Sequence, residues 1–294
     1  MKKLVIYMFA VLMLMGCGQS YEEKQKMTRA EQARLKTQDS LALKVAVLPT
    51  LDCMPVYLAK AHNMFDTLGV SVHLRMLNAQ IDCDSGLIGG SIEGAVTDIK
   101  RVEQMRKKGT MLDVLGNTNA YWQLITNRTA RLKEVRQLGD KMVAMTRYSA
   151  TDYLTDKVLK GVKTSAGVFQ IQINDVNVRL QMLLNNEIDA MWLSEPQATT
   201  ARLYNNPVLK DSRDMNETLG VVAFRSHALK DRYRQKQVAL FVKGYNAACD
   251  SLNKYGLRHY ADLIKQYCNT DDKTIKALPK IKFIHISDAR VKSR

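Results

Sequence analysis

Short apolar runs alternate with amphipathic stretches along the chain from about residue 44 onward. Three of the runs predict β-strands: residues 44–48, 71–77 and 94–97. Two of the stretches, in which apolar residues recur every three or four positions, predict helices: residues 54–65 and 99–108. Asp52 is the expected cap of the first helix, Pro55 lies in its first turn, and Gly109 ends the second. Strands that alternate with helices in this way are typical of an α/β protein with a mainly parallel sheet.

The same order of elements returns 96 residues further along the chain. Residues 87–94, LIGGSIEG, align with residues 183–190, LLNNEIDA. Two further matches occur at this offset: Tyr57-Leu58 with Tyr153-Leu154, and residues 72–78 with residues 168–174. Three matches in one register predict two similar βαβαβ lobes. Generic α/β periodicity is the alternative explanation, because helix-turn-strand units resemble one another.

The repeat divides the chain into two lobes. Residues 41–124 are expected to form lobe 1, which residues 220–294 return to complete, and residues 125–219 are expected to form lobe 2. The chain then crosses between the lobes twice, near residues 122–126 and 219–223, and two crossings make a hinge. Ligands of open α/β sheets bind beyond the carboxyl ends of the strands, where helix N-termini present free N–H groups. We therefore expect one ligand cleft between the lobes.

Composition and charge narrow the function classes. The chain has 294 residues, of which 46% are hydrophobic and 25% charged, as in an ordinary globular protein, and this excludes a disordered chain. Lys and Arg outnumber Asp and Glu by 44 to 29, and the net charge of +15 favours anionic partners. The basic residues are nevertheless spread along the whole chain, with no block interleaved with aromatic residues. We therefore expect a solvated basic surface and no nucleic-acid partner.

Residues 1–16 have the pattern of an export signal. Two lysines precede an apolar run over residues 4–15, which is too short to span a bilayer unaided. The segment Leu14-Met15-Gly16-Cys17 resembles a bacterial lipobox, and this resemblance implies that Cys17 becomes the lipidated first residue after cleavage. An ordinary secretory signal with an incidental cysteine is the alternative.

Residues 17–40 are expected to be a tether. This segment is rich in Glu, Lys, Gln, Arg and Thr and has one aromatic residue, Tyr21, so it cannot bury enough apolar surface to fold alone. No later segment reaches the ~20 apolar residues of a membrane helix. The chain is therefore predicted to be exported and held by its lipid at a membrane of the cell envelope, facing the periplasm or the exterior.

Four cysteines remain after the lipobox: Cys53, Cys83, Cys249 and Cys268. An even number of cysteines in an exported chain suggests disulfides, and four cysteines allow three pairings. Cys53 follows the first predicted strand and Cys83 the second, so both are expected at the same edge of one sheet, whereas Cys249 and Cys268 fall on consecutive helices. We therefore predict disulfides between Cys53 and Cys83 and between Cys249 and Cys268. Zinc is not expected, because the spacing of these cysteines is not that of a zinc site.

Four segments together resemble a known family. They are residues 45–57, the turn MFDTLGV at 64–70, GSIEGA at 90–95 and IDAMWLSEP at 188–196. These segments are similar to those of the solute-binding proteins of ABC importers for sulfonates, nitrate and thiamine-precursor pyrimidines, over about residues 43–270. The resemblance implies a type II periplasmic-binding-protein fold, a ligand caught between the lobes, and delivery of that ligand to a permease and ATPase complex. It also implies a monomer.

The predicted cleft edges carry ten candidate ligand-binding residues. Lobe 1 contributes Asp52, Met54, Gln80, Asp98 and Tyr121, and lobe 2 contributes Arg147, Tyr148, Ser149, Asp175 and Glu195. Ser149 and Ser194 both look like helix N-caps, and Ser194 begins a capping box with Gln197 at the fourth place. A cap that serves only its own helix is the alternative role of these serines.

The candidate residues also indicate the chemistry of the ligand. Arg147 precedes a predicted helix N-terminus, which favours a carboxylate, sulfonate or phosphate, unless it pairs with a surface acid. Four acids oppose a purely anionic ligand and suit amino, amidine or aminopyrimidine groups, unless they act as helix caps: Asp52, Asp98, Asp175 and Glu195. Four aromatic residues are candidates for a stacking wall: Tyr121, Trp122, Tyr148 and Trp192. A place in the core is the equally open alternative for Trp122 and Trp192. A zwitterionic or heterocyclic solute with both donor and acceptor groups reconciles the cation with the acids.

Catalytic motifs are missing from the sequence. It contains no G-x-S-x-G, no H-E-x-x-H, no phosphate-binding G-x-x-x-x-G-K and no dinucleotide fingerprint, and its 5 histidines are scattered. A fungal pyrimidine synthase with this fold uses a pyridoxal cofactor, to which an exported lipoprotein has little access. We therefore expect no enzyme activity, no cofactor and no metal. A lipid-anchored ligand sensor or scaffold with the same fold and no transport role is the alternative function.

Overall fold

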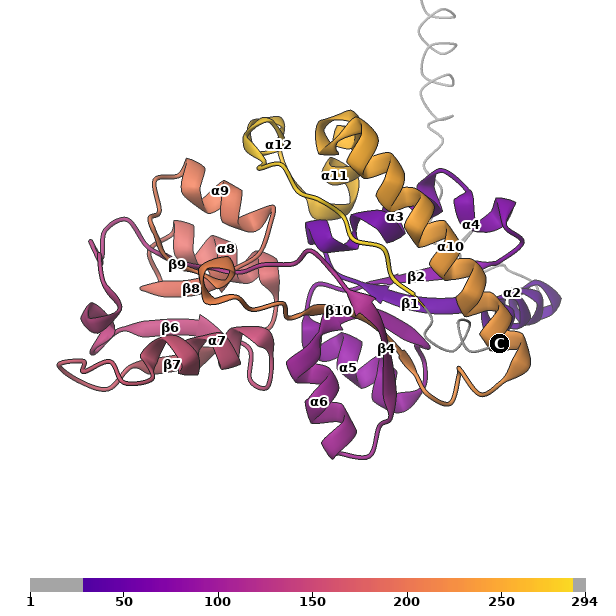
Figure 1. Ribbon diagram of the computed structural model, residues 1–294, viewed down its shortest axis with the longest axis horizontal. Helices are drawn as coiled ribbons and strands as arrows, with labels where there is room; N and C mark the ends of the chain where they lie inside the picture. Colours follow the sequence, from indigo (N-terminus) through magenta and orange to yellow (C-terminus); the bar gives the residue numbers. More distant parts are fainter. Residues whose placement is uncertain (1–28, 288–294) are drawn as a thin grey trace, which may run out of the picture. The chain divides into compact units, whose positions relative to one another are not determined.

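The computed structural model describes residues 29–287, and the chain from Ala42 onward forms one compact unit. Two five-stranded sheets form its framework (Figure 1). The first sheet has the order β2-β1-β3-β10-β4 and consists of β1 (Leu43–Val47), β2 (Val72–Met76), β3 (Gly94–Asp98), β4 (Leu112–Asn117) and β10 (Gly220–Arg225). The second has the order β7-β6-β8-β5-β9 and consists of β5 (Gln123–Thr126), β6 (Met142–Met145), β7 (Phe169–Gln172), β8 (Ala190–Leu193) and β9 (Val208–Asp211). We call the first sheet with its helices lobe 1 and the second with its helices lobe 2.

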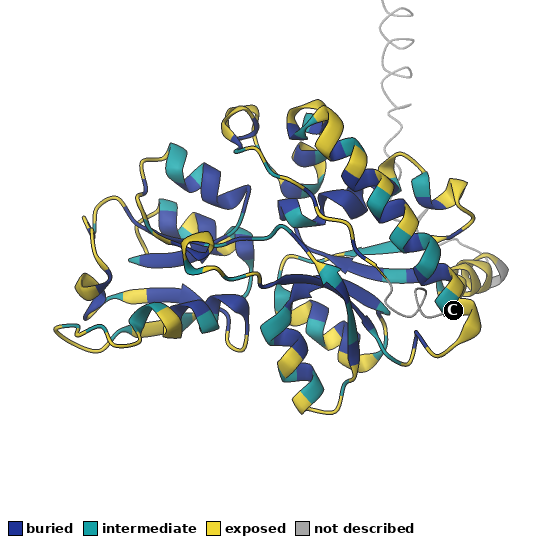
Figure 2. Cartoon of the chain, in the orientation of Figure 1, coloured by how far each residue is buried: buried dark blue, intermediate teal, exposed yellow. Residues whose placement is uncertain are grey.

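Helices cover both faces of each sheet, and Figure 2 shows the strands buried between them. In lobe 1 these are α3 (Met54–Ala61), α4 (Met64–Thr67), α5 (Gln80–Gly89), α6 (Ile99–Lys107) and α10 (Arg232–Tyr255), followed by α11 (Ala261–Cys268) and α12 (Asp272–Ala277). In lobe 2 they are α7 (Ala150–Leu159), α8 (Val176–Leu184) and α9 (Gln197–Leu203). Short 3-10 turns complete the set: η2 (Leu51–Cys53), η3 (Val135–Leu138), η4 (Ser212–Met215) and η5 (Leu257–Tyr260).

The two sheets repeat one topology, as the 96-residue offset predicts. In each sheet, one strand (β1 or β6) lies parallel to both neighbours. One strand from beyond the crossing (β10 or β5) runs antiparallel between the third strand of the order and the edge strand (β4 or β9). Three pairs of elements begin 96 residues apart: α3 and α7, α5 and α8, and β3 and β8. The repeat is therefore confirmed, and with it the α/β class.

Aromatic and aliphatic side chains fill the interior of each lobe. In lobe 1, the ring of Phe241 on α10 packs against Phe65 and Phe224, with ring centroids 5.3 Å apart in both pairs. In lobe 2, Trp192 on β8 is fully buried and its indole N–H donates to the Thr155 hydroxyl at 2.9 Å. Each side chain of this size stabilises the fold by about 1.5–3 kcal/mol when it leaves water. The strand ends beyond these cores are thereby held in place.

Two short segments connect the lobes side by side. Residues 118–122 lead from β4 to β5, and residues 216–219 lead back from η4 to β10. The N–H of Thr118 donates to the Gly220 carbonyl at 2.8 Å, which pairs the two crossings directly. Two paired crossings without a helix are the kind of connection that permits hinge motion.

Three helix ends differ from the sequence prediction. The helix predicted over residues 54–65 is interrupted, because Asn63 adopts a left-handed conformation with φ of 54°. Asp52 lies within η2 and does not cap α3, whose N-cap is Cys53. The capping box at Ser194 is also wrong, because α9 begins at Gln197 with no side-chain cap.

The cap of α7 is confirmed. Ser149 precedes the first residue of that helix, and its hydroxyl accepts a hydrogen bond from the Thr151 N–H at 3.1 Å. One of the otherwise unpaired N–H groups at the start of α7 is thus satisfied by a side chain.

Helix α2 (Arg29–Leu41) belongs to a separate unit at the N-terminal end of the chain. It falls within the predicted tether, and its side chains from Glu31 to Leu41 are almost all exposed. The predicted signal peptide at residues 1–16 and the lipidation site at Cys17 lie outside the described residues. Among residues 29–287, no helix has the length and apolar character needed to cross a bilayer.

The predicted disulfides are wrong. All four cysteines are free, buried thiols: Cys53, Cys83, Cys249 and Cys268. Cys53 is the N-cap of α3 and Cys83 lies on α5, and Figure 1 shows these two helices on opposite faces of the first sheet. The chain runs from β1 outward to β2 and then back past β1 to β3, so two crossovers of the same hand place their helices on opposite faces. The sheet therefore separates the two thiols.

The second predicted pair fails because its thiols face different neighbours. The Cys249 thiol donates to the Ile284 carbonyl at 3.5 Å. Cys268, at the end of α11, lies among the buried residues of lobe 1, near enough to Asp52 for that charge to raise its pKa further, after burial. Each cysteine thus packs as a small apolar side chain.

Candidate functional site

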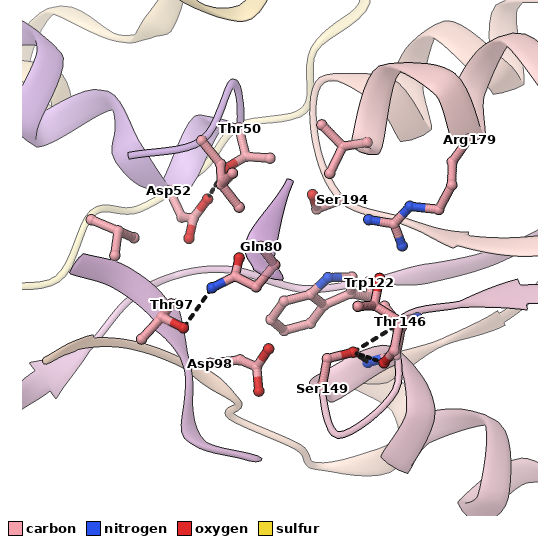
Figure 3. A pocket seen from close by; sticks show the side chains of 14 residues that line it. Thr50, Asp52, Gln80, Thr97, Asp98, Trp122, Thr146, Ser149, Arg179 and Ser194 are labelled. Atoms are coloured by element: carbon pink, nitrogen blue, oxygen red, sulfur yellow. Dashed lines mark hydrogen bonds between the residues drawn. The ribbon is translucent and has the colours of Figure 1, made fainter. Parts of the chain in front are cut away.

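A cavity of about 50 Å³ lies between the two lobes, beyond the carboxyl ends of the strands of both sheets (Figure 3). Lobe 1 lines it with Leu48, Thr50, Asp52, Gln80, Val96, Thr97 and Asp98, lobe 2 with Thr146, Ser149, Thr151, Val176, Arg179 and Ser194, and the crossing segment with Trp122. We call this space the interlobe cavity. It is large enough for a few water molecules or for the polar part of a small solute.

Hydrogen bonds join the lobes around this cavity. They run from Leu51 N to Glu195 O at 2.9 Å, from Gln197 Nε2 to Pro49 O at 2.8 Å and from Val176 N to Asn78 O at 3.2 Å. Ala79 and Asp175, which occupy equivalent positions 96 residues apart, form an isolated antiparallel bridge across the lobes. The structure therefore has the lobes closed on each other.

Asp52 forms part of the lobe 1 wall. It lies in η2, just past the end of β1, and its Oδ1 accepts a hydrogen bond of 2.6 Å from the Thr50 hydroxyl. Burial raises the pKa of Asp52, and hydrogen bonds, not a neighbouring cation among the described residues, oppose that rise. A ligand that brings an N–H donor or a positive charge would supply what this carboxylate lacks.

Asp98, at the end of β3, is more fully engaged. It is 5% exposed, caps α6, and accepts a hydrogen bond of 3.0 Å from the Arg101 N–H. Burial raises the pKa of Asp98, while the charge of Arg101 and the N–H of Ala150 in lobe 2 favour its ionised form. Both lobes therefore hold this carboxylate.

Gln80, the first residue of α5, completes the polar wall of lobe 1. Its Nε2 donates to the Thr97 hydroxyl at 2.6 Å, as Figure 3 shows. This bond fixes the plane of the Gln80 side-chain amide at the N-terminus of α5. A primary amide in this position is suited to orient a polar ligand.

Hydroxyl groups dominate the facing wall of lobe 2. The Ser149 hydroxyl donates to the Thr146 carbonyl at 2.6 Å and accepts from the Thr151 N–H. The Thr151 hydroxyl in turn accepts from the Thr146 N–H at 2.9 Å. These bonds close the turn between β6 and α7, so the hydroxyls first serve the local fold.

Arg179 brings a positive charge into the cavity from lobe 2. It is 6% exposed on α8, and its Nη1 donates to the Trp192 carbonyl at 3.3 Å. Its Nε–H has no hydrogen-bond partner in the described part of the chain. Burial lowers the pKa of Arg179 to about 10, with Asp175 opposing, so the guanidinium is charged at neutral pH. Figure 3 shows this guanidinium turned toward the cavity, across from Asp52 and Asp98.

A second arginine joins the lobes behind the cavity. Arg101 on α6 is 3% exposed, and its Nε pairs with the Asp84 carboxylate at 3.1 Å. Its Nη1 donates to the Arg147 carbonyl of lobe 2 at 3.0 Å. Burial raises the pKa of Asp84 to about 6 in spite of this ion pair. The pair lies next to the Asp98 cap and links the cavity wall to the outer surface.

Four of the ten predicted ligand residues line the interlobe cavity: Asp52, Gln80, Asp98 and Ser149. The structure places Met54 in the lobe 1 core, fully buried. Asp175 caps α8, with its Oδ1 accepting from the N–H groups of Asn177 and Val178. Of the aromatic candidates, Trp122 lines the cavity and Trp192 lies in the lobe 2 core.

Tyr121, in the segment that crosses between the lobes, and Glu195 belong to a buried hydrogen-bond network. The Tyr121 hydroxyl donates to Glu195 Oε1 at 2.8 Å, and Arg202 pairs with the same oxygen at 2.9 Å. The other carboxylate oxygen accepts from both the N–H and the hydroxyl of Thr199. The Glu195 carboxylate is thus fully engaged within the protein.

Arg147 and Tyr148 lie apart from the interlobe cavity. Both are exposed and line a different hollow of about 260 Å³, which α5 and α6 border from lobe 1. Tyr148 has a φ of 61°, and Asp152 accepts a hydrogen bond from its N–H at 2.7 Å. The cation of the cavity is therefore Arg179, which the sequence analysis did not single out.

The helical spacing of apolar residues around Arg179 is a sequence signal that could have identified it. Val176, Leu180 and Leu183 recur at the spacing of one helix face, and Arg179 falls within that buried stripe. An arginine on a buried helix face requires a partner or a ligand. Strand ends alone do not reveal such a residue.

No three His, Cys, Asp or Glu side chains between residues 29 and 287 come close enough to hold a metal ion. The charged residues that line the interlobe cavity are two carboxylates, Asp52 and Asp98, and one arginine, Arg179.

Comparison with known proteins gives a likeness of structure only. No family model matches the chain, and no curated protein matches its sequence. The alkanesulfonate-binding protein of Xanthomonas axonopodis pv. citri, solved with MOPS bound, has a TM-score of 0.68 at 17% identity, covering 86% of this chain and 89% of its own. The nitrate-binding protein of Synechocystis has a TM-score of 0.69 at 12% identity, covering 80% and 68%. The ligand-binding component of an ABC-type import system from Staphylococcus aureus, solved with zinc bound, has a TM-score of 0.67 at 16% identity, covering 83% and 86%.

These likenesses define the class of fold. The structural neighbours are periplasmic solute-binding proteins of ABC-type importers, and the chain shares their two-lobed α/β fold. Its strand order and its two crossings are those of the type II form, as the sequence resemblance implies. The fold prediction is therefore confirmed.

Proposed function

We propose that this protein is an extracytoplasmic solute-binding lipoprotein that captures a small polar or heterocyclic solute between its lobes and delivers it to the permease of an ABC importer. The observation that carries the proposal is the interlobe cavity, in which a buried arginine has an unpartnered N–H opposite a carboxylate that lacks a cation. Similar folds that bind alkanesulfonate and nitrate support a solute-binding role.

The ligand has two unlike ends in this proposal. The Nε–H of Arg179 requires an acceptor, such as a carboxylate, a sulfonate or a ring nitrogen. Asp52 favours a donor, such as an amino or amidine group. Trp122 offers a flat apolar surface between them. An aminopyrimidine of the thiamine-precursor type, an amino acid or an amino-sulfonate has this pattern of groups.

Closure follows from the same geometry. A solute that touches Arg179 of lobe 2 and Asp52 of lobe 1 makes both contacts only when the lobes are together, so it stabilises the closed form. The hydrogen bonds across the lobes, such as Leu51 N to Glu195 O, form in that state. The crossings at residues 118–122 and 216–219 serve as the hinge. Solute binding thereby favours the closed form, in which the two lobes together present one surface. The permease recognises that surface.

The remaining parts of the proposal rest on the sequence. Cys17 carries the lipid, residues 17–40 form the tether, and residues 41–124 with 220–294 form one moving body against residues 125–219. The protein acts as a monomer without enzyme activity, at a membrane of the cell envelope. A sensor or scaffold would have the same cavity but would present the closed surface to a receptor and not to a permease.

A solute screen tests this function. Thermal unfolding of the chain lacking residues 1–17 is measured with aminopyrimidines, thiamine fragments, sulfonates, nitrate and amino acids. A solute present at 100 times its Kd adds roughly 2.7 kcal/mol to the free energy of unfolding, which raises the unfolding midpoint clearly. We expect the solutes with both a donor and an acceptor to stabilise most. If nitrate and simple sulfonates alone raise the midpoint, the ligand class is wrong.

Asp52→Asn then tests the donor end. We expect calorimetry to show about tenfold weaker binding of the amino-bearing solute, because the carboxylate charge is lost. Binding to the unchanged protein weakens as the pH falls toward the raised pKa of Asp52, because protonation removes the same charge, and the variant lacks this dependence. Asp140→Asn, an exposed position in lobe 2, is the control with an equal change of charge. Equal affinity in both variants would remove Asp52 from the site.

A further inference from the structure

Lobe 1 contains another hollow, which shares no lining residue with the interlobe cavity or with the hollow at Arg147 and Tyr148. Its volume is about 460 Å³, and it lies where α10 ends, between the last turn of that helix, η5 and residues 278–281. We call it the basic hollow. A volume of this size is within the range of sites for small organic molecules.

The wall of the basic hollow is held rigidly. Asn253 on α10 exchanges two hydrogen bonds with the backbone of Phe283, at 2.9 and 2.8 Å. Asn246, two turns earlier, does the same with Ile286, at 2.9 Å in both directions. The extended segment after α12 is therefore clamped along α10 by two side chains on one helix face. The hollow lies just beyond the end of this clamp.

Apolar groups form the floor. Leu252, Leu257 and Leu278 are buried with 1–7% exposure, and Pro279 and Ile281 are partly buried beside them. This surface is suited to an alkyl chain or a ring, because contact with such a group removes apolar area from water.

Cations form the rim. Lys254, Arg258 and Lys280 line the hollow, all three are exposed, and no acidic residue lines it. Within residues 29–287, none of the three is in an ion pair with a carboxylate; Arg258 donates to the Lys276 carbonyl, and the Lys254 ammonium lies over the exposed ring of Tyr255 at 4.9 Å. Three unneutralised cations around one hollow attract an anion.

The surrounding chain strengthens this attraction. Between Arg225 and Ser287 the chain has 13 lysines and arginines but only 5 acids. An excess of charge over a whole segment raises the local concentration of counter-charged molecules. The three rim cations then give the anion a defined place.

We propose that the basic hollow binds an anionic amphiphile, in which a phosphate or carboxylate contacts Lys254, Arg258 and Lys280 and an attached chain or ring covers the leucine floor. The amphiphile is either an anionic lipid of the membrane or a free small molecule with the same chemistry. This site does not depend on solute capture in the interlobe cavity.

Octyl phosphate, used below its micelle concentration, is the probe. It is titrated by calorimetry into the chain lacking residues 1–17 and into the variant Lys254→Gln/Arg258→Gln/Lys280→Gln. We expect about tenfold weaker binding in this variant and a change within about twofold in the control Lys236→Gln/Lys243→Gln/Lys273→Gln, which removes the same charge from exposed positions outside the hollow. Unfolding midpoints confirm that both variants fold.

Two further probes separate the sources of the amphiphile. Vesicles of phosphatidylcholine with phosphatidylglycerol are compared with vesicles of pure phosphatidylcholine. If the mixed vesicles bind the unchanged protein but not the rim variant, and the pure vesicles bind neither protein, the ligand is a membrane lipid. Binding of octyl phosphate without vesicle binding assigns a free amphiphile.

Three results would overturn the proposal. The first is that neither octyl phosphate nor the anionic vesicles bind the unchanged protein. The second is that the rim variant and the control lose binding equally. The third is binding of inorganic phosphate as tight as that of octyl phosphate, because the apolar floor would then contribute nothing.

Discussion

The two lobes have one architecture but bring different chemistry to the cavity between them. Thr50 and Thr146 are equivalent in the 96-residue repeat, and both line the cavity, Thr50 just past β1 and Thr146 just past β6. At the ends of the equivalent strands β3 and β8, however, lobe 1 has Asp98 where lobe 2 has Ser194. The repeated backbone therefore determines where side chains meet, and the residue type determines what they bind.

Helices α5 and α8, which are equivalent in the repeat, show the contrast most clearly. Cys83 on α5 and Arg179 on α8 are equivalent positions, and both are buried. The cysteine completes a hydrophobic core, whereas the arginine brings a charge to the cavity. Lobe 1 thus supplies the negative wall and lobe 2 the positive one, and a solute with unlike ends favours closure of such a site.

The largest expected effect appears when each of these two equivalent positions is replaced by an apolar residue and the two variants are compared. Arg179→Met is expected to weaken solute binding about hundredfold, or about 3 kcal/mol, because the acceptor of the ligand then loses its only cation in the cavity. Cys83→Ala is expected to leave the affinity unchanged, since this thiol lies in the core of lobe 1. Calorimetry on both variants measures the difference.

Circular dichroism serves as the control for both substitutions. If Arg179→Met keeps the native affinity while folding normally, the positive wall of lobe 2 is not part of the site, and the contrast between the lobes has no functional meaning.

A smaller effect concerns Asp84, whose equivalent in lobe 2 is Leu180. The pKa of Asp84 is raised to about 6 by burial, so folding favours its neutral form. This stabilisation is fully present below about pH 4, the unfolded pKa, and is lost as the pH rises through about 6, a change of about 3 kcal/mol. Asp84→Asn is expected to remove this part of the pH dependence.

Urea unfolding at several pH values between 4 and 7 compares the two proteins. The relevant quantity is the difference in slope with pH, because the substitution also shifts the stability of the variant by an amount that does not depend on the titration of Asp84. Parallel curves would show that Asp84 titrates normally and that the two lobes do not differ in this respect.

The smallest effect separates local folding from ligand contact at the start of α7. Ser149→Ala is expected to lower the free energy of unfolding by about 1 kcal/mol, because the helix loses its cap. Solute affinity should stay within about twofold, since the hydroxyl is already bonded to Thr146 and Thr151. Chemical denaturation and calorimetry give the two values, and a tenfold loss of affinity would instead make Ser149 a ligand contact.

Local patterns were sufficient to predict much of the fold. The strand and helix order, the 96-residue repeat and the cap at Ser149 depend on hydrophobic spacing and on residues close in the chain. The carboxylates near strand ends were predictable for the same reason, since Asp98 is the last residue of β3 and Asp52 lies in the turn that follows β1. Both line the interlobe cavity.

Other predictions required knowledge of which face a side chain occupies. Cys53 and Cys83 both follow strands, but successive crossovers place their helices on opposite faces of the sheet. Arg147 directly precedes a helix and yet is exposed, whereas Arg179, inside a helix, faces the cavity. Proximity to a strand end does not specify the direction of a side chain.

The sequence by itself therefore determined the class of fold, the repeat and the two crossings between the lobes, because these follow from periodicity and from the order of elements. Only the tertiary structure decided which charged groups meet in the cavity and which cysteines stay apart. The physical reason is that the handedness of the crossovers and the packing of each helix face are set by contacts between segments distant in the chain.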